Sequence, residues 1–315
     1  MKRLLYIGNG DPPFSTENHY AASFRAEGVE VVFAQEDRTD WADRLRLAKE
    51  HEVDAAAWTC TWHGVDVDNA AAALDVLHTN NVTTFGLHLD LYVGLDRQAQ
   101  IASDPWWKCQ WMMTADGDPD HQRWFDTHGI RHRWVPPGVY DAECYLAEPN
   151  PRVRAEIVWV GSWRRYHPEW LDWRRKMIAG LARRYRSRFT LAGDGRNRTV
   201  RGEQLNRLLA SVKVVVGDSC LADRLAGYTS DRLFETPGRG GLLVYPRIPL
   251  VDGDLMVDGT HYYAYKPADL DSLIATVDRA LDDPDRESIR LAGHEHVKAN
   301  HTYRHRVRTI LEHLS

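Results

Sequence analysis

The stretch at residues 229–251, TSDRLFETPGRGGLLVYPRIPLV, combines the residue types that bind phosphates and sugar hydroxyls. A helix of barely two turns is expected here, ending at a Gly-rich turn before a buried strand. The backbone N–H groups of Thr229, Ser230 and Asp231, at the start of that helix, can bind a diphosphate. Glu235, one turn later, can accept hydrogen bonds from two vicinal hydroxyls such as those of a ribose.

Two further places can supply positive charge or a close approach of backbone to a phosphate. Arg232 lies in the same short helix. The segment GSWRR follows an apolar run, so Gly161 and Ser162 allow a ligand near the backbone, and Arg164 or Arg165 can pair with a diphosphate bidentately. Each arginine can instead form a surface ion pair or open a solvated basic helix.

Three side chains in the first half are candidates for orienting or deprotonating a hydroxyl. Asp11 follows the first apolar run, and His88 and Asp90 alternate in GLHLDLY, so they point to the same side of a strand. Such groups can serve as a general base. Asp194 and Asp218 also follow strands, although turn chemistry explains Asp in loops equally well. Short Asp-x-Asp strings are common in loops, so no metal site is predicted.

The composition is that of an ordinary soluble globular protein. The 315 residues suffice for two domains, with 43% hydrophobic and 27% charged residues. No apolar run approaches the roughly 18–20 residues of a membrane span, and the N-terminal apolar segment is too short for a signal peptide. The four cysteines form no CxxC motif, so we expect reduced thiols and a cytoplasmic location.

Charge is distributed unevenly along the chain. Residues 1–150 hold 12 Lys and Arg against 24 Asp and Glu, a net charge of −12. Residues 151–200 hold 13 against 4, a net charge of +9. A basic block favours nucleic acid or the phosphate of a small ligand, and the acidic first half argues against nucleic acid across a whole face.

Apolar runs alternate with amphipathic helical segments through both halves of the chain. This alternation predicts an α/β protein with two Rossmann-like, doubly wound parallel sheets facing across a cleft. We expect a first domain at residues 1–150, a second at 151–300, and a last helix at 301–315 whose apolar stripe packs on the first domain. Ligands are expected beyond the carboxyl ends of the strands.

The segment at residues 230–311 resembles the C-terminal half of CgeB-type glycosyltransferases, a branch of the GT-B glycosyltransferases. The shared pattern is R-x-[FL]-E before a Gly-rich turn and a hydrophobic strand, then VDG, a tyrosine and an LD helix, and finally H-T-Y-x-H-R. The resemblance implies the GT-B fold and a UDP-sugar or other nucleotide-diphosphate sugar as co-substrate, without a further cofactor.

The resemblance also implies a division of labour between the domains. The second domain would hold the donor, and the first would hold an acceptor hydroxyl that receives a hexosyl or pentosyl unit with retained configuration. Glu235 falls at the ribose-binding position of the Glu-x7-Glu pattern, and Gly227 stands where the sugar-contacting Glu would be.

Three alternatives stay open at the level of sequence. A phage-type glycosyltransferase that modifies hydroxylated DNA bases would use the basic block at residues 151–200. A non-catalytic nucleotide-sugar-binding protein would fit the missing carboxylate at Gly227. An epimerase of the same fold would interconvert nucleotide sugars without an acceptor.

Overall fold

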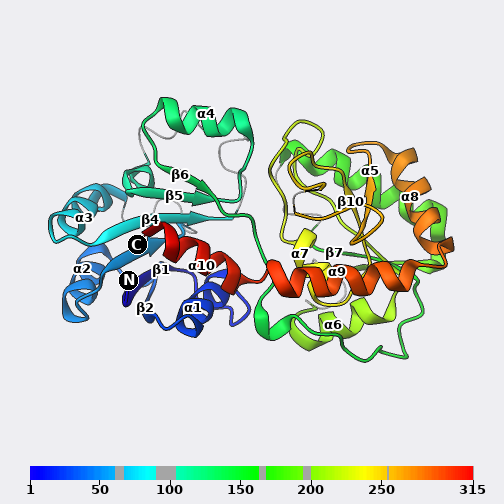
Figure 1. Cartoon of the computed structure of the whole chain (residues 1–315), viewed down its shortest axis with the longest axis horizontal. Coiled ribbons are helices and arrows are strands. Elements are labelled where there is room, and N and C mark those ends of the chain that lie inside the picture. Colours follow the sequence, from blue (N-terminus) through cyan, green and yellow to red (C-terminus); the bar gives the residue numbers. More distant parts are fainter. Residues whose placement is uncertain (61–66, 90–103, 163–167, 194–199, 254, 315) are drawn as a thin grey trace. The chain divides into compact units, whose positions relative to one another are not determined.

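The computed structural model describes residues 1–60, 67–89, 104–162, 168–193, 200–253 and 255–314. The chain forms two compact units: unit 1 is Met1–Pro136 with Tyr303–Ser315, and unit 2 is Pro137–Thr302 (Figure 1). The sequence-based boundary at residue 150 differs from this division. Asn206 of unit 2 donates from Nδ2 to the carbonyls of Glu143 (2.8 Å) and Tyr145 (3.1 Å), which ties the segment before residue 150 to unit 2.

Unit 1 is built on a parallel sheet of six strands in the order β2-β1-β3-β4-β5-β6. Its strands are β1 (Arg3–Gly8), β2 (Glu30–Gln35), β3 (Ala55–Trp58), β4 (Thr83–His88), β5 (Trp111–Thr114) and β6 (His132–Trp134). The helices are α1 (Thr16–Ala26), α2 (Trp41–Glu50), α3 (Val67–Thr79), α4 (Pro119–Thr127) and α10 (Tyr303–Leu314), with the 3-10 turn η3 (Pro105–Lys108).

Local sequence explains why these helices start where they do. Ser15 caps α1 by accepting from the N–H of Asn18, and Asp40 caps α2 by accepting from the N–H of Asp43. The central strands are buried almost throughout: Leu4 to Ile7 of β1 are at most 1% exposed and all of β3 is buried, whereas the edge strands β2 and β6 are mostly half-buried. Continuous apolar strands of this kind are typical of parallel sheets covered on both faces.

Unit 2 contains a parallel sheet of five strands in the order β11-β10-β9-β7-β8. Its strands are β7 (Ile157–Val160), β8 (Phe189–Ala192), β9 (Val214–Val216), β10 (Leu243–Pro246) and β11 (Tyr263–Tyr265). The helices are α5 (Pro168–Tyr185), α6 (Gly202–Ser211), α7 (Arg232–Gly238), α8 (Leu270–Asp282) and α9 (Arg286–Asn300), with the 3-10 turns η4 (Asp141–Glu143) and η5 (Arg186–Arg188).

The prediction of two doubly wound parallel sheets is confirmed. In each sheet the chain continues outward from a central strand and then returns to its other side, which creates a topological switch point. That point lies between β1 and β3 in unit 1 and between β7 and β9 in unit 2. Strand β11 was not among the predicted strands.

The last helix, α10, belongs to unit 1, where it packs on α1. The rings of Tyr20 and Tyr303 are 4.7 Å apart. Glu27, at the end of α1, accepts from Nε of Arg304 (2.7 Å) and Nε of Arg308 (2.9 Å). These ion pairs lower the pKa of Glu27, with the hydrogen bond from Arg308 contributing most.

We predict that Ile310→Ala destabilises unit 1 by about 2–5 kcal/mol. Ile310 is 0% exposed in α10, so truncation leaves a cavity that its neighbours fill only in part. Denaturant unfolding measures the loss, with the half-buried Leu314→Ala in the same helix as the matched control. Equal, small losses in the two variants would contradict a core role for α10.

Candidate functional site

The carboxyl edge of the unit 2 sheet brings together several of the predicted binding residues. Gly161 and Ser162 follow β7, Asp218 follows β9, and α7 begins at Arg232. Strands β7 and β9 are neighbours, so the two loops lie at the same edge, at the switch point. The predicted residues Arg164, Arg165 and Asp90, as well as Asp194, lie outside the described residues.

Arg232 presents an unpaired guanidinium at this edge. Its Cζ lies 5.8 Å from the ring centroid of Trp159, a cation–π distance. Within the described parts of the chain it has no carboxylate and no hydrogen-bond partner, whereas a half-buried arginine ordinarily has one. An unpaired arginine stacked on an aromatic ring is suited to binding a phosphate bidentately.

Gly161 makes room for this arginine. A Cβ at residue 161 would lie 2.4 Å from Nη2 of Arg232, and the φ of 150° is unfavourable for residues with side chains. Gly161 N–H donates to the carbonyl of Ala192 (2.9 Å), so this backbone group is already used within the sheet. The absence of a side chain at Gly161 therefore allows the guanidinium of Arg232 to lie against the end of β7.

Of the three residues before Arg232, Ser230 differs from what the sequence suggested. The N–H of Ser230 donates to the hydroxyl of Tyr245 (2.9 Å), and Ser230 Oγ donates to the carbonyl of Asp218 (2.9 Å). The N-cap of α7 is Asp231, without a side-chain capping bond. Thr229 is fully buried, and its Oγ1 has no partner among the described residues. Ser230 thus fixes the entry of α7 and does not offer its N–H to a ligand.

Glu235 is one of two carboxylates on a single arginine. Its Oε1 lies 3.2 Å from Nη2 of Arg239, which also pairs with Glu143. Arg239 Nη1 further donates to Oδ1 of Asn206 at 2.7 Å. Burial raises the pKa of Glu143, Arg239 opposes the rise and Glu235 adds to it. The second oxygen of Glu235 has no partner in the described structure and can accept from a ligand hydroxyl.

A buried ion pair behind Arg232 was missed at the level of sequence. Arg174 Nε donates to Oδ2 of Asp218 (2.8 Å), Nη2 donates to Oδ1 (3.1 Å), and Nη1 donates to the carbonyl of Ser162 (2.7 Å). Trp159 Nε1 also donates to Oδ1 of Asp218, at 3.4 Å. The sequence pattern indicates Asp218 only as a residue that follows a strand, and it does not single out Arg174.

The position of Arg174 along α5 is the sequence feature that could have indicated its burial. Buried side chains of this helix follow helical spacing, and Arg174 falls on that same face. The other large side chains of the buried stripe are Trp170, Trp173, Met177, Leu181 and Tyr185. A charged residue on an apolar stripe indicates a buried partner.

In unit 1, Asp11 follows β1, and His88 is the last residue of β4. Asp11 forms an ion pair with Arg38, and both side chains are largely exposed. His88 ends β4, with Nδ1 at 3.4 Å from the carbonyl of Thr59 and its ring 5.3 Å from that of Trp106. His88 is therefore held by its neighbours, while the carboxylate of Asp11 is already engaged by a cation.

A carboxylate–histidine pair beyond β5 was also missed. His121 Nδ1 lies 2.7 Å from Oδ2 of Asp116, with side-chain exposures of 13% and 2%. Nε2 of His121 has no partner among the described residues. Asp116 comes two residues after Thr114, which pairs with His88 in the β4–β5 ladder. An aspartate that holds Nδ1 leaves Nε2 available to accept a proton.

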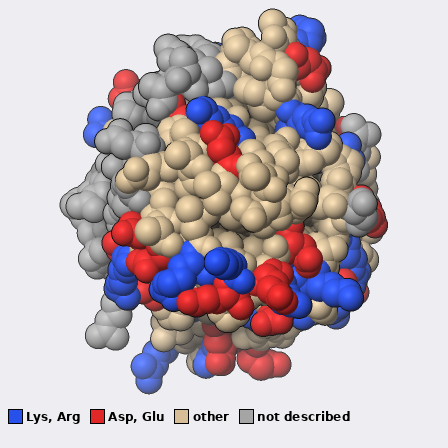
Figure 2. Space-filling model, turned by 90° about the vertical axis from the view of Figure 1, so that its left-hand side faces the viewer, with Lys and Arg blue, Asp and Glu red and all other residues tan. Residues whose placement is uncertain are grey.

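Four of the nine Lys and Arg residues that the structure describes in the basic block at residues 151–200 form ion pairs within the protein. Its paired arginines and their acidic partners are Arg174 with Asp218, Arg175 with Asp172, Arg184 with Asp278, and Arg188 with Glu156. Figure 2 views the molecule from the left-hand side of Figure 1, where unit 1 lies, and shows acidic and basic residues interspersed around an uncharged area, without an extended basic surface among the described residues of that face. The charges on that face do not favour a nucleic-acid interface there.

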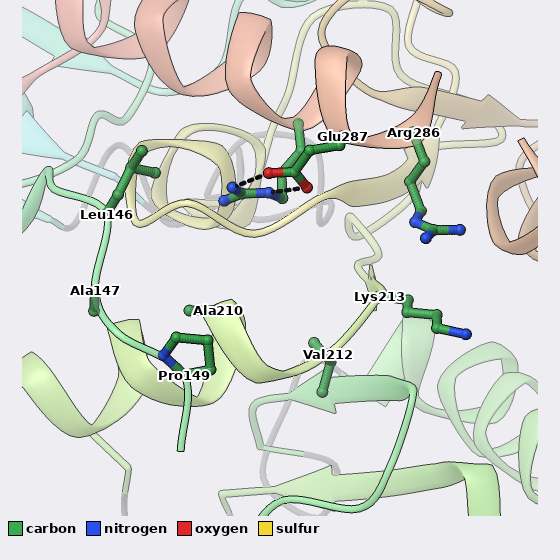
Figure 3. A pocket seen from close by; sticks show the side chains of 9 residues that line it. Leu146, Ala147, Pro149, Ala210, Val212, Lys213, Arg286 and Glu287 are labelled. Carbon is green, nitrogen blue, oxygen red and sulfur yellow. Dashed lines mark hydrogen bonds and ion pairs between the residues drawn. The ribbon is translucent and has the colours of Figure 1, made fainter. Parts of the chain in front are cut away.

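Two surface cavities of unit 2 lie away from this edge. One, of about 290 Å³, contains the side chains of Lys213, Arg286 and Arg290, the last held by Glu287 (Figure 3). Lys213 precedes β9, so this cavity is at the opposite end of the sheet from Asp218. The other, of about 540 Å³, is lined by residues including Arg152 and Arg207. Neither is lined by the site residues described above.

Comparison with known proteins agrees with this architecture. A family model described as "Glycosyl transferase-like" matches residues 165–312, slightly less than half of the chain. The match contains Arg174, Asp218, Arg232 and Glu235. No curated protein matches the chain.

Solved structures resemble the whole chain. A sucrose-phosphate synthase from Thermosynechococcus elongatus has a TM-score of 0.63 at 12% identity, covering 100% of this chain and 99% of its own. HepE from Anabaena, in complex with UDP-glucose, has a TM-score of 0.64 at 11% identity, with 100% and 99% coverage. A UDP-forming α,α-trehalose-phosphate synthase from Burkholderia xenovorans has a TM-score of 0.64 at 12% identity, with 99% and 98% coverage. The chain has the GT-B fold.

Two negative findings apply to the described residues. None of the helices in this part of the chain is both long and apolar enough to cross a membrane. No group of three or more His, Cys, Asp or Glu side chains there is arranged to hold a metal ion.

We predict that Asp116→Asn lowers the pKa of His121, read from the imidazole signals by NMR. Burial by itself would lower that pKa, but the hydrogen bond and charge of Asp116, with Asp118 and Asp120 nearby, raise it above its usual value. Asp120→Asn, which removes an exposed charge without the hydrogen bond, is the matched control and should have a smaller effect.

The raised pKa also sets the pH dependence of stability. A histidine whose pKa is higher in the folded state stabilises the fold fully below its unfolded pKa, about 6.5, and loses this contribution as pH rises through the folded value. Asp116→Asn should therefore cost more stability at pH 5 than at pH 9. The same loss at both pH values would contradict a charged pair.

Proposed function

We propose that the protein transfers a sugar from a nucleotide-diphosphate sugar to an acceptor hydroxyl. The observation that carries the proposal is the unpaired guanidinium of Arg232, stacked on Trp159 at the switch point of unit 2. A diphosphate is the anion proposed for this position, because Arg232 lies over Trp159 and has no ion-pair or hydrogen-bond partner among the residues that the structure describes. The likeness of residues 165–312 to glycosyl transferase-like proteins supports the proposal.

The proposed chemistry needs charge stabilisation more than covalent assistance. As the bond between the sugar and the diphosphate breaks, negative charge grows on the leaving oxygen, and a fixed cation stabilises the transition state more than the ground state. Arg232 would supply that charge, with Arg164 or Arg165 as further candidates. Glu235 would accept from the hydroxyls of the donor ribose through its second oxygen.

Unit 1 would hold the acceptor at its own strand ends. His88 and Asp90 remain the proposed groups for orienting the acceptor hydroxyl, and Asp11 is a weaker candidate because Arg38 pairs with it. We propose a hexosyl or pentosyl unit, UDP as the nucleotide, and retention of configuration in keeping with the CgeB-type resemblance. The cysteines in the described residues are all free and buried, in keeping with a proposed cytoplasmic location.

A non-catalytic nucleotide-sugar-binding protein is the second candidate. It is favoured by Gly227, which supplies no carboxylate for the sugar. Release of UDP from UDP-glucose, measured with and without a panel of hydroxyl acceptors, separates the two functions. Donor binding without any turnover would support the binding protein and contradict the enzyme.

We predict that Arg232→Met weakens UDP binding by about 10- to 100-fold, because a charge-assisted hydrogen bond contributes about 1.5–3 kcal/mol. Isothermal titration calorimetry measures the change. Arg224→Met is the matched control, since Arg224 is exposed and its nearest carboxylate, that of Asp223, is 3.8 Å away. Unchanged UDP affinity in a folded Arg232→Met protein would overturn the diphosphate assignment.

We predict that Glu235→Gln weakens binding of UDP more than binding of the 2′,3′-dideoxy analogue. The ribose hydroxyls are the proposed partners, and an amide accepts from them less strongly than a carboxylate does. Glu287→Gln, at an exposed pair with Arg290, is the control. A loss of the same size for both nucleotides would indicate that Glu235 serves only to hold Arg239.

A further inference from the structure

The carboxylate of Asp218 is the most deeply buried charge at the candidate site. Asp218 is 0% exposed, and its carboxylate oxygens accept from Arg174 and from Trp159. Burial of a carboxylate costs free energy unless a cation balances its charge. The side chain of Arg174, 3% exposed, is the cation that does so.

Two arginines lie beside the same indole ring. Cζ of Arg174 is 5.3 Å from the ring centroid of Trp159, and Cζ of Arg232 is 5.8 Å from it. Trp159 Nε1 in turn donates to Asp218. Two guanidinium groups therefore lie beside the ring of Trp159, and of these two only Arg174 is hydrogen-bonded to Asp218.

We propose that Arg174 is a positioning residue that keeps Arg232 available for the donor diphosphate by neutralising Asp218. This inference rests on the proposed function. With Arg174 in place, the group of Asp218, Arg174 and Arg232 has one uncompensated positive charge. Without it, the buried carboxylate attracts Arg232, the group becomes neutral, and the affinity for an anion falls.

The backbone strengthens the coupling between Asp218 and Arg232. The carbonyl of Asp218 accepts from Ser230 Oγ, two residues before Arg232. Arg174 also holds the carbonyl of Ser162, in the loop whose Gly161 lies against Arg232. Arg174 thereby fixes the surroundings of Arg232 while having its own donors directed to Asp218 and Ser162.

The experiment compares Arg174→Met, Asp218→Asn and the double variant, with calorimetry of UDP, pyrophosphate and uridine. We expect Arg174→Met to lose about 10- to 100-fold in affinity for UDP and pyrophosphate, as for loss of one charge-assisted contact, and little for uridine, which has no phosphate. The double variant should regain most of the loss, because the carboxylate that captures Arg232 is gone. Arg184→Met, on the same helix at an exposed pair with Asp278, is the control and should bind as the wild type does.

The outcomes separate the inference from the proposed function. Wild-type binding of pyrophosphate but not UDP would overturn the nucleotide donor, while the pattern among the variants would still decide the role of Arg174. Binding of neither ligand by the wild type would overturn both. No recovery in the double variant, or an equal loss for uridine, would reduce Arg174 to a purely structural residue.

Asp218→Asn alone covers the case in which Arg174→Met does not fold. It removes the negative charge, keeps both arginines and leaves a side-chain oxygen that can still accept from Arg174, so among the folded protein pyrophosphate affinity should not fall below that of the wild type. A fall in that affinity would contradict the proposal. Arg174→Lys, which keeps the charge, should bind pyrophosphate more tightly than Arg174→Met.

Discussion

The buried charge of Asp218 is the constraint on which the carboxyl edge of unit 2 depends. Removing one partner from a buried ion pair typically costs several kcal/mol, because the remaining charge is uncompensated. The pair joins the ends of β7 and β9 to α5, and the carbonyl of Asp218 extends the connection to Ser230 and α7. One interaction therefore positions the loops at the place where a doubly wound sheet binds its ligand.

Tyrosines from the neighbouring strands complete this edge. The hydroxyl of Tyr265 donates to the carbonyl of Gly217 (3.1 Å), and that of Tyr245 accepts from the N–H of Ser230. Burial raises the pKa of Tyr245 to about 12, so it stays a neutral hydroxyl at physiological pH. Neutral hydroxyls satisfy backbone groups at the edge without adding negative charge where an anion would bind.

Unit 1 is completed by the return of the chain. The N–H of Val139 donates to the carbonyl of His301 (3.1 Å) within unit 2, and Nε of Arg306 donates to the carbonyl of Pro136 (2.9 Å) within unit 1. Within each unit, the segment at residues 136–139 is therefore hydrogen-bonded to the segment at residues 301–306. Burial lowers the pKa of Arg306 to about 10, which still leaves it charged at neutral pH.

Sequence reasoning was most successful where the signal is local. The apolar run at residues 3–8 predicted a buried strand, and the pattern from Arg232 to the Gly-rich turn predicted a short helix. The structure contains both, as β1 and α7. It was least successful where a partner is chosen by the fold. Arg174 and Asp218 are 44 residues apart, and no spacing rule joins them. Ser230 was expected to offer its N–H to a ligand, but Tyr245, on another strand, accepts it.

Under the proposed function, the donor and the acceptor place different demands on the sequence. A nucleotide diphosphate demands an unpaired cation, a close backbone and a carboxylate at fixed positions, and all the described candidates for these roles lie at residues 161–235. An acceptor hydroxyl makes weaker demands, which a carboxylate, an imidazole or a water can meet at any of several strand ends. Under the proposed function, unit 2 is therefore the part in which sequence pattern and chemistry should agree. The match over residues 165–312 contains Asp218, Arg232 and Glu235 but not Gly161 or Ser162, includes most of α10, and contains none of residues 1–136.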